Sequence, residues 1–197
     1  MKKLLITGFE PFGGETVNPS WLAVEKLHDN IGDFELTKLL IPVVFEKSAE
    51  VVINKANEIN PDVILCIGQA GGRDAVTPEM VGINLRYASI PDNKGNEPRD
   101  EKISESGENA YFTTLPARMI VEGISAMQIP SKVSYTAGAY VCNDVIYTLL
   151  EHYENTDVKV GFIHVPYIPE QEKQPSMPLS DIIRALTRAI EIISDNL

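Results

Sequence analysis

The 197-residue sequence contains few cysteines and no long hydrophobic run. Its two cysteines, Cys66 and Cys142, could form at most one disulfide, and neither belongs to a Cys-x-x-Cys pair of the kind that binds metals. No apolar stretch approaches the roughly 18 residues that a membrane-spanning helix needs, since the run Val63–Ile67 ends at Gly68. The apolar stretch near the N-terminus is too short for a secretion signal, so we expect a cytoplasmic protein.

Basic side chains are also scarce. Lys and Arg total 17 against 28 Asp and Glu, which gives a formal net charge of −11. Binding to nucleic acid depends on a basic surface, so this balance argues against a nucleic-acid partner. Hydrophobic residues at 44% and charged residues at 23% are ordinary for a globular protein and exclude a wholly disordered chain. We expect one domain spanning residues 1–197.

Short β-branched segments alternate with helical patterns along the chain. The predicted strands are 3–7, 35–44, 63–67, 81–88, 132–136 and 159–165. The first predicted helix begins at Asn18-Pro19, and three more cover 46–58, 116–126 and 143–153. A last amphipathic helix is predicted to begin with Ser180 as its cap. This alternation predicts an α/β fold, a largely parallel sheet with helices on both faces. Residues 91–109 have no apolar period and are predicted to form a long surface loop.

Ligands of parallel α/β sheets bind beyond the carboxyl ends of the strands, and two glycine-rich segments follow predicted strands there. Gly8–Gly14 has glycines spaced as in a phosphate-binding loop, but it lacks the Lys-Ser/Thr ending and carries Phe9 and Phe12. A tight turn whose phenylalanines pack on the core is the simpler interpretation. Gly68–Gly72 indicates either a close backbone approach to a ligand or a plain turn.

The two cysteines differ in their surroundings. Cys66 lies inside an apolar strand, where a free cysteine behaves as a small hydrophobic residue. Cys142 lies where a helix is predicted to begin, and the positive end of a helix lowers the pKa of a thiol and favours the nucleophilic thiolate. The same position leaves backbone amides free to bind an oxyanion. Cys142 is therefore a candidate nucleophile, with a structural role still open.

A nucleophilic cysteine needs a base, and the chain has three histidines. His28 and His152 lie on amphipathic segments and are interpreted as surface residues. His164 lies at the carboxyl end of a strand, where it is either the base or a hydrogen-bonded core histidine. A third group should orient the imidazole, and Glu79, directly before a strand, is one candidate among 28 acidic residues.

Several segments resemble pyrrolidone-carboxylate peptidase, also called pyroglutamyl-peptidase I. The similar segments are 7–14 with 18–20, 68–73, 90–93, 133–138 with 142–143, and 161–167. They occur in order over nearly the whole chain, and two of them match the family's signatures around its catalytic Glu and Cys.

The resemblance implies a catalytic triad of Glu79, Cys142 and His164. It also implies a three-layer α/β/α sandwich and a cytosolic cysteine exopeptidase without metal or cofactor, often a homotetramer, that removes N-terminal pyroglutamate from peptides. The lactam pocket implied by the resemblance consists of six residues: Phe9, Phe12, Gln69, Ile90, Tyr140 and Val141.

The sequence departs from the family pattern at three positions. Many relatives carry an Arg, thought to assist the oxyanion, where this chain has Ser89. Arg86 lies three residues earlier, and an odd offset on a strand places it on the opposite face, so we do not expect it to substitute. Val43 and Tyr140 stand where Thr and Phe are common.

Two other functions fit parts of the sequence. The first is a pyroglutamyl-peptide binder that lost turnover together with the Arg. The second is a nucleoside- or phosphate-handling enzyme built on the Gly8–Gly14 loop.

Overall fold

Six strands form one sheet in the computed structural model, which describes all residues from 1 to 197. The strand order is β2-β3-β1-β4-β8-β5. The strands are β1 Lys2–Phe9, β2 Asn30–Ile31, β3 Phe34–Ile41, β4 Val63–Gln69, β5 Thr77–Pro78 and β8 Lys159–Val165. The four central strands are parallel, whereas the short edge strands β2 and β5 are antiparallel to their neighbours. The sheet is therefore largely parallel, as predicted.

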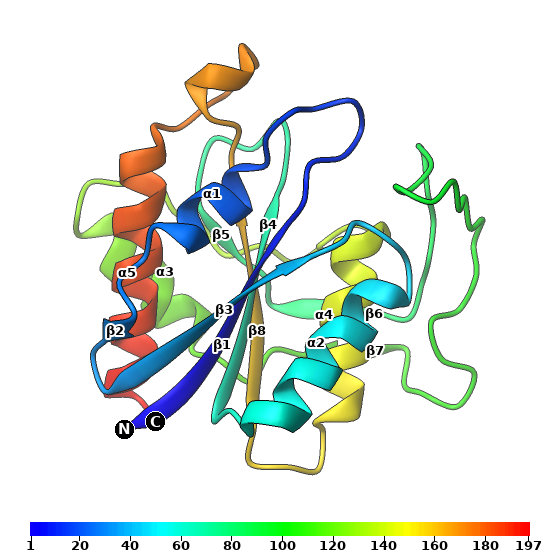
Figure 1. Ribbon diagram of the computed structural model, residues 1–197, viewed down its shortest axis with the longest axis horizontal. Helices are drawn as coiled ribbons and strands as arrows, with labels where there is room; N and C mark the ends of the chain where they lie inside the picture. Colours follow the sequence, from blue (N-terminus) through cyan, green and yellow to red (C-terminus); the bar gives the residue numbers. More distant parts are fainter.

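Helices cover both faces of this sheet and complete three layers (Figure 1). The helices are α1 Pro19–Glu25, α2 Lys47–Ile59, α3 Ala117–Ser125, α4 Val141–His152 and α5 Leu179–Asp195. One face packs against α1, α3 and α5, and the other against α2 and α4. A separate pair of short strands, β6 Val81–Ile83 and β7 Ala110–Phe112, packs beside α4. The α/β/α architecture expected from the sequence is confirmed.

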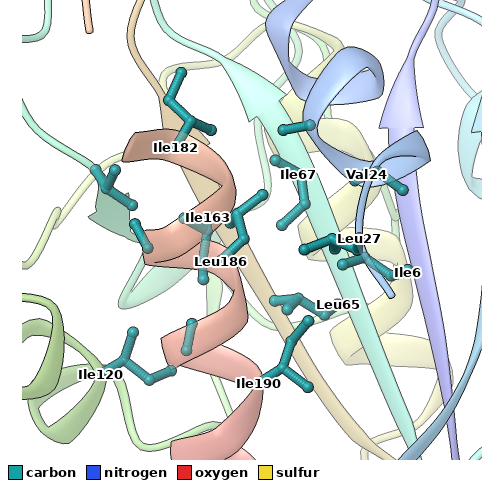
Figure 2. Packing of buried hydrophobic residues seen from close by; sticks show 14 of the residues in the cluster. Ile6, Val24, Leu27, Leu65, Ile67, Ile120, Ile163, Ile182, Leu186 and Ile190 are labelled. Carbon is teal, nitrogen blue, oxygen red and sulfur yellow. The ribbon is translucent and has the colours of Figure 1, made fainter. Parts of the chain in front are cut away.

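Alternate residues of the central strands supply the two hydrophobic cores, because successive side chains of a strand point to opposite faces. On β1, Leu4 and Ile6 belong to one core and Leu5 to the other. Figure 2 shows the first core, in which side chains of the sheet face those of α1, α3 and α5. The labelled residues are Ile6, Val24, Leu27, Leu65, Ile67, Ile120, Ile163, Ile182, Leu186 and Ile190. The stretches of the central strands that are buried on both faces are therefore mostly apolar.

Several predicted boundaries are wrong. Residues 132–136 form no strand. The chain pairs there with the residues flanking β5 only through two isolated bridges, Val76–Ser131 and Glu79–Ser134. The strand predicted over 81–88 ends at Ile83. The last helix begins at Leu179 with Pro178 at the cap position, so Ser180 lies in the first turn rather than capping it.

The predicted long loop is confirmed, since residues 91–109 contain no helix and no strand. The start of this loop is fixed by Asp92, whose carboxylate accepts hydrogen bonds from the backbone amides of Phe45, Lys94 and Asn96. No helix in the structure combines the length and the apolar composition that crossing a membrane requires.

The two chain ends lie close together at the amino ends of the parallel strands (Figure 1). Lys2 donates its amide to the carbonyl of Asp33, and Ser194 near the other end accepts a hydrogen bond from the amide of Asp33 at 2.9 Å. Both ends therefore meet the β2–β3 turn.

The carboxyl end of β1 is held against α1 by a close backbone approach at Gly8. A Cβ atom placed on Gly8 would lie 2.6 Å from the Cα atom of Trp21, which is too close for any side chain. We predict that Gly8→Ala lowers the free energy of unfolding by about 1–3 kcal/mol, measured by urea denaturation, because the helix backbone must shift.

Gly123→Ala is the matched control. There the added methyl group overlaps only the Cδ1 atom at the end of the Ile192 side chain, and its other neighbours, on Arg188 and Ile192, lie 3.4 Å away. Alanine is also favoured over glycine inside a helix. Its effect is expected to stay below about 1 kcal/mol. An equal loss of unfolding free energy in the two variants would contradict the explanation that Gly8 is required by the close approach of the α1 backbone.

Candidate active site

Glu79 and His164 form a buried pair at one edge of the sheet. Strand β5 pairs antiparallel with β8, and Glu79 directly follows it, donating its amide to the carbonyl of Phe162 at 2.9 Å. This pairing brings Oε1 of Glu79 to 2.7 Å from Nδ1 of His164, although the residues are 85 positions apart. An ionised carboxylate can only accept, so Nδ1 donates the hydrogen bond and Nε2 of the neutral ring is left as an acceptor.

Arg73 joins the same carboxylate. Its Nη1 atom lies 2.6 Å from Oε1 of Glu79 and 2.6 Å from the hydroxyl of Thr77, and Nη2 donates to the carbonyl of Thr136 at 2.9 Å. Burial raises the pKa of Glu79, but the hydrogen bond and charge of His164 together with Arg73 outweigh burial, so the pKa is lowered overall. Glu79 therefore stays ionised although its side chain is fully enclosed.

Cys142 is the second residue of helix α4, and the two residues after it anchor the start of that helix. The side chain of Asn143 accepts from the amide of Ile83 and donates to the carbonyls of Ile83 and Leu85. Asp144 accepts from the amide of Glu46 at 2.7 Å and from Nε of Arg86 at 2.5 Å. These bonds connect the start of α4 to Glu46 and to residues 83–86, and they hold Cys142 in place.

The thiol of Cys142 lies over Gly68 at the end of β4. A Cβ atom placed on Gly68 would lie 3.0 Å from Sγ of Cys142 and 2.8 Å from the ring of Phe162, so this position accommodates the thiol only because it is glycine. Burial, aided by the charge of Glu79, raises the pKa of the Cys142 thiol to about 12. The expected lowering of this pKa at the helix start is therefore wrong, because the loss of hydration outweighs the helix. Cys142 is a neutral thiol at rest.

His164 is suited to deprotonate that thiol. Burial lowers the pKa of His164 below its usual value, against the hydrogen bond and the charge of Glu79, so the ring is neutral at pH 7. Cys142 and His164 line the same cavity without a direct hydrogen bond between them. Catalytic hydrogen bonds are often long before substrate binds.

The start of α4 also supplies two free donors. The backbone amides of Val141 and Cys142 donate to no other residue of the protein, as expected for the first residues of a helix. Both residues line the cavity, so their amides could bind the negative oxygen that forms when the thiolate attacks a carbonyl group.

A cavity of about 160 Å³ opens beside the thiol. Its lining is mostly apolar and comprises Phe9, Phe12, Asn18, Val43, Gln69, Ala70, Arg73, Ala137, Tyr140, Val141, Cys142 and His164. A cavity of about 150 Å³ admits benzene, which has six heavy atoms. A five-membered lactam also has six heavy atoms, so the cavity has the size of one such ring.

Five of the six residues expected in the pocket line this cavity, and Ile90 is the exception. Ile90 is exposed on the surface and lies against Gly13, outside the lining. Arg86 pairs with Asp144 and Glu46 and not with any residue of the triad, in line with the expectation that it does not replace the missing Arg. Ser89 is exposed.

The remaining thiol and histidines lie elsewhere. Cys66 is fully buried in the second core, and burial raises its pKa to about 12. Both cysteines are free. His28 and His152 are exposed. No three His, Cys, Asp or Glu side chains converge on a point that could hold a metal ion.

The role of Arg73 is not apparent from the sequence. Arg73 is the last residue of the similar segment 68–73, and no spacing rule links that loop to Glu79. Asn18 was expected as a helix cap, which is confirmed, but it also lines the cavity while its Nδ2 atom donates to the carbonyl of Glu10.

The rate at which a neutral thiol beside a neutral imidazole is alkylated depends on pH in a characteristic way. We predict that alkylation of Cys142 by iodoacetamide is constant with pH above about 7 and slows in acid, with a midpoint below 6.5, as His164 becomes protonated. In His164→Ala the rate should be low at pH 7 and rise about tenfold per pH unit into the alkaline range, since the thiol must then ionise unaided. The rate is measured by mass spectrometry of the Cys142 peptide, with Cys66→Ala as the background. An unchanged profile in His164→Ala would exclude His164 as the base.

The charge of Arg73 adds to the lowering of the His164 pKa. We predict that Arg73→Gln shifts the acid midpoint of the same alkylation profile to higher pH, because removing this cation makes protonation of the imidazole easier. Arg118→Gln, on the exposed face of α3, is the control and should leave the midpoint unchanged. A midpoint in Arg73→Gln that stays fixed or moves to lower pH would refute this assignment.

The chain is similar over its whole length to proteins of one family. The family model described as pyroglutamyl peptidase matches residues 2–196. The pyrrolidone-carboxylate peptidase of Brachyspira hyodysenteriae is 50% identical over 190 residues, covering 93% of this chain and 94% of that protein. The enzyme of the same name from Thermosipho africanus is 49% identical over 199 residues, covering 97% and 96%.

Solved structures extend the similarity to the fold. Pyroglutamyl peptidase I from Bacillus amyloliquefaciens superposes with a TM-score of 0.95 at 47% identity, covering 99% of this chain and 98% of that one. Pyrrolidone carboxyl peptidase from Thermococcus litoralis also gives a TM-score of 0.95, at 36% identity, covering 99% and 94%. A full-length match to the family model and relatives near 50% identity leave one assignment: the chain belongs to the pyroglutamyl peptidase family.

Proposed function

We propose that this chain is a cysteine exopeptidase that hydrolyses the amide bond after an N-terminal pyroglutamyl residue. Cys142 is the nucleophile, His164 the general base and acid, and Glu79 the residue that orients the imidazole. The observation that carries the proposal is the 2.7 Å Glu79–His164 hydrogen bond beside the thiol, at the wall of a cavity that fits one lactam ring.

The reaction begins with proton transfer from the Cys142 thiol to Nε2 of His164. The sulfur then attacks the carbonyl carbon that links pyroglutamate to the next residue, and the negative oxygen is stabilised by the amides of Val141 and Cys142. The imidazolium ion donates its proton to the leaving amine, which leaves a thioester on Cys142.

Hydrolysis of the thioester repeats these steps with water. His164, neutral again, takes a proton from a water molecule that attacks the thioester carbonyl. The sulfur leaves and regains a proton from His164, and free pyroglutamate is released. Glu79 keeps Nδ1 protonated throughout and stabilises the imidazolium ion that forms twice in each cycle.

Specificity for pyroglutamate follows from the charge of the ring. The lactam is neutral, so the rings of Phe9, Phe12 and Tyr140 can enclose it at little cost. An ordinary N-terminal ammonium group would lose its hydration in this cavity without gaining a carboxylate partner. The hydroxyl of Tyr140 donates to the carbonyl of Pro91 at 3.0 Å and so connects the wall of the cavity to the long loop.

Residues 1–197 are proposed to form one catalytic domain, because both hydrophobic cores share the single six-stranded sheet. The homotetramer and the cytoplasmic location stay predictions of the sequence.

The two cysteines give the most direct test. We predict that Cys142→Ala lowers the release of amine from a pyroglutamyl anilide by at least about a thousandfold, because Cys142 carries the only thiol in the cavity lining. Cys66→Ala, the control, should keep most of the activity, since Cys66 lies outside the cavity. Hydrolysis that persists in Cys142→Ala would exclude the mechanism. Calorimetric binding of 2-pyrrolidone without any thiol-dependent hydrolysis by the natural sequence would indicate a binding protein instead.

A further inference from the structure

Gln171 is a polar residue outside the triad whose side chain contacts Gln69, a residue of the cavity lining. It is the last residue of the short 3-10 helix η1, Pro169–Gln171, in the connection from β8 to α5. Its Oε1 atom accepts a hydrogen bond from the backbone amide of Ile168 at 3.1 Å. A backbone N–H can only donate, so this bond fixes which end of the Gln171 amide is the oxygen.

The nitrogen of the same amide donates to two acceptors. Nε2 of Gln171 lies 2.9 Å from Oε1 of Gln69 and 3.2 Å from Oε2 of Glu15. A hydrogen bond from Lys173 lowers the pKa of Glu15, so this carboxylate is ionised and accepts only. Both protons of the Gln171 amide are therefore used, and Gln69 must present its oxygen to Gln171.

The orientation of Gln69 follows from this arrangement. With Oε1 turned toward Gln171, the Nε2 group is the free end of the amide, and it donates to no acceptor in the protein. Gln69 lines the cavity. Only three buried polar side-chain atoms in the chain lack a partner, on Thr7, Glu79 and Tyr153, so Nε2 of Gln69 is accessible rather than buried.

We propose that Gln171 is a positioning residue that fixes the amide of Gln69 so that an N–H donor faces the bound ring. This inference rests on the proposed function and extends it to the recognition of the substrate. The partner of that donor is the carbonyl oxygen of the lactam, which only accepts. A proline ring of similar size has no such oxygen and leaves the donor without an acceptor, which a closed site disfavours.

Gln171→Glu tests the proposal. The new side chain can still accept from the amide of Ile168 and has nearly the same size, but it cannot donate to Gln69. The Gln69 amide should then rotate, donate Nε2 to the carboxylate and turn Oε1 toward the cavity. We predict that the dissociation constant of 2-pyrrolidone, measured by calorimetry, rises about 10- to 100-fold, because an acceptor then faces the lactam carbonyl.

Gln171→Glu should also change the selectivity between pyroglutamyl and prolyl substrates. The ratio of kcat/KM for a pyroglutamyl anilide to that for a prolyl anilide should fall about 10- to 100-fold, mainly through KM for the pyroglutamyl substrate. Glu170→Gln, an exposed neighbour in the same turn, changes one charge without touching Gln69 and should leave both measurements unchanged. The alkylation rate of Cys142 should also be unaffected in Gln171→Glu, which separates this change from a loss of the site.

Gln171→Met provides a second variant if the added charge prevents folding. It keeps the length of the side chain and removes the orienting hydrogen bonds, so the dissociation constant of 2-pyrrolidone should rise about 3- to 10-fold. Unchanged binding of 2-pyrrolidone in a folded Gln171 variant would overturn the proposal. A fall in kcat with unchanged binding would overturn it too, because Nε2 of Gln69 would then serve the oxyanion instead of the lactam.

The two proposals fail in different ways. A natural sequence that binds 2-pyrrolidone and cleaves nothing overturns the proposed function alone. A natural sequence that cleaves pyroglutamyl anilide, with unchanged selectivity in Gln171→Glu, overturns the role of Gln171 alone.

Discussion

A carboxylate enclosed on all sides, that of Glu79, is the constraint on which the rest of the site depends. Burying a charge is unfavourable unless donors surround it, and here His164 and Arg73 both donate to the same oxygen atom. The two hydrogen bonds constrain the segments that carry the donors. His164 must hold its ring in one tautomer on β8, and the loop after β4 must fold back so that Arg73 reaches the edge strand β5.

The thiol is positioned by a different set of forces. Asn143 and Asp144 attach the start of α4 to the segment 83–86, and Gly68 near the end of β4 leaves room for the sulfur atom of Cys142. Burial keeps both the thiol and the imidazole uncharged, so no ion pair has to be desolvated when a neutral ring enters. The charge separation that accompanies proton transfer then occurs next to the carboxylate of Glu79, which favours the imidazolium ion.

The sequence predicted the parts of this site that local patterns encode. Apolar runs revealed the four parallel strands, and the position of Cys142 at a helix start and of His164 at a strand end followed from general rules for parallel sheets. The choice of Glu79 required resemblance to a family, because strand β5 has two residues and no periodicity of its own. Arg73 and Gln171 were missed for a related reason, since each acts through a side-chain contact between loops distant in sequence.

Errors arose where tertiary contacts replaced local preference. The segment 132–136 is β-branched enough to suggest a strand, yet it has a neighbour on one side only and makes single bridges there. The pKa of Cys142 is a second example, because the helix position was readable from the sequence whereas the burial that outweighs it was not. In both cases the deciding interaction is long-range.

The meeting of the two chain ends at the β2–β3 turn has a practical consequence. The cavity lies at the carboxyl ends of β1, β4 and β8, whereas Lys2 and Ser194 lie at the opposite ends of the sheet. A short linker could therefore join residues 1 and 197, and new ends could be opened in a surface loop such as 154–158 without crossing the cavity wall. The fold is thus suited to circular permutation, and affinity tags or surface tethers at residue 1 or residue 197 would leave the cavity entrance unobstructed.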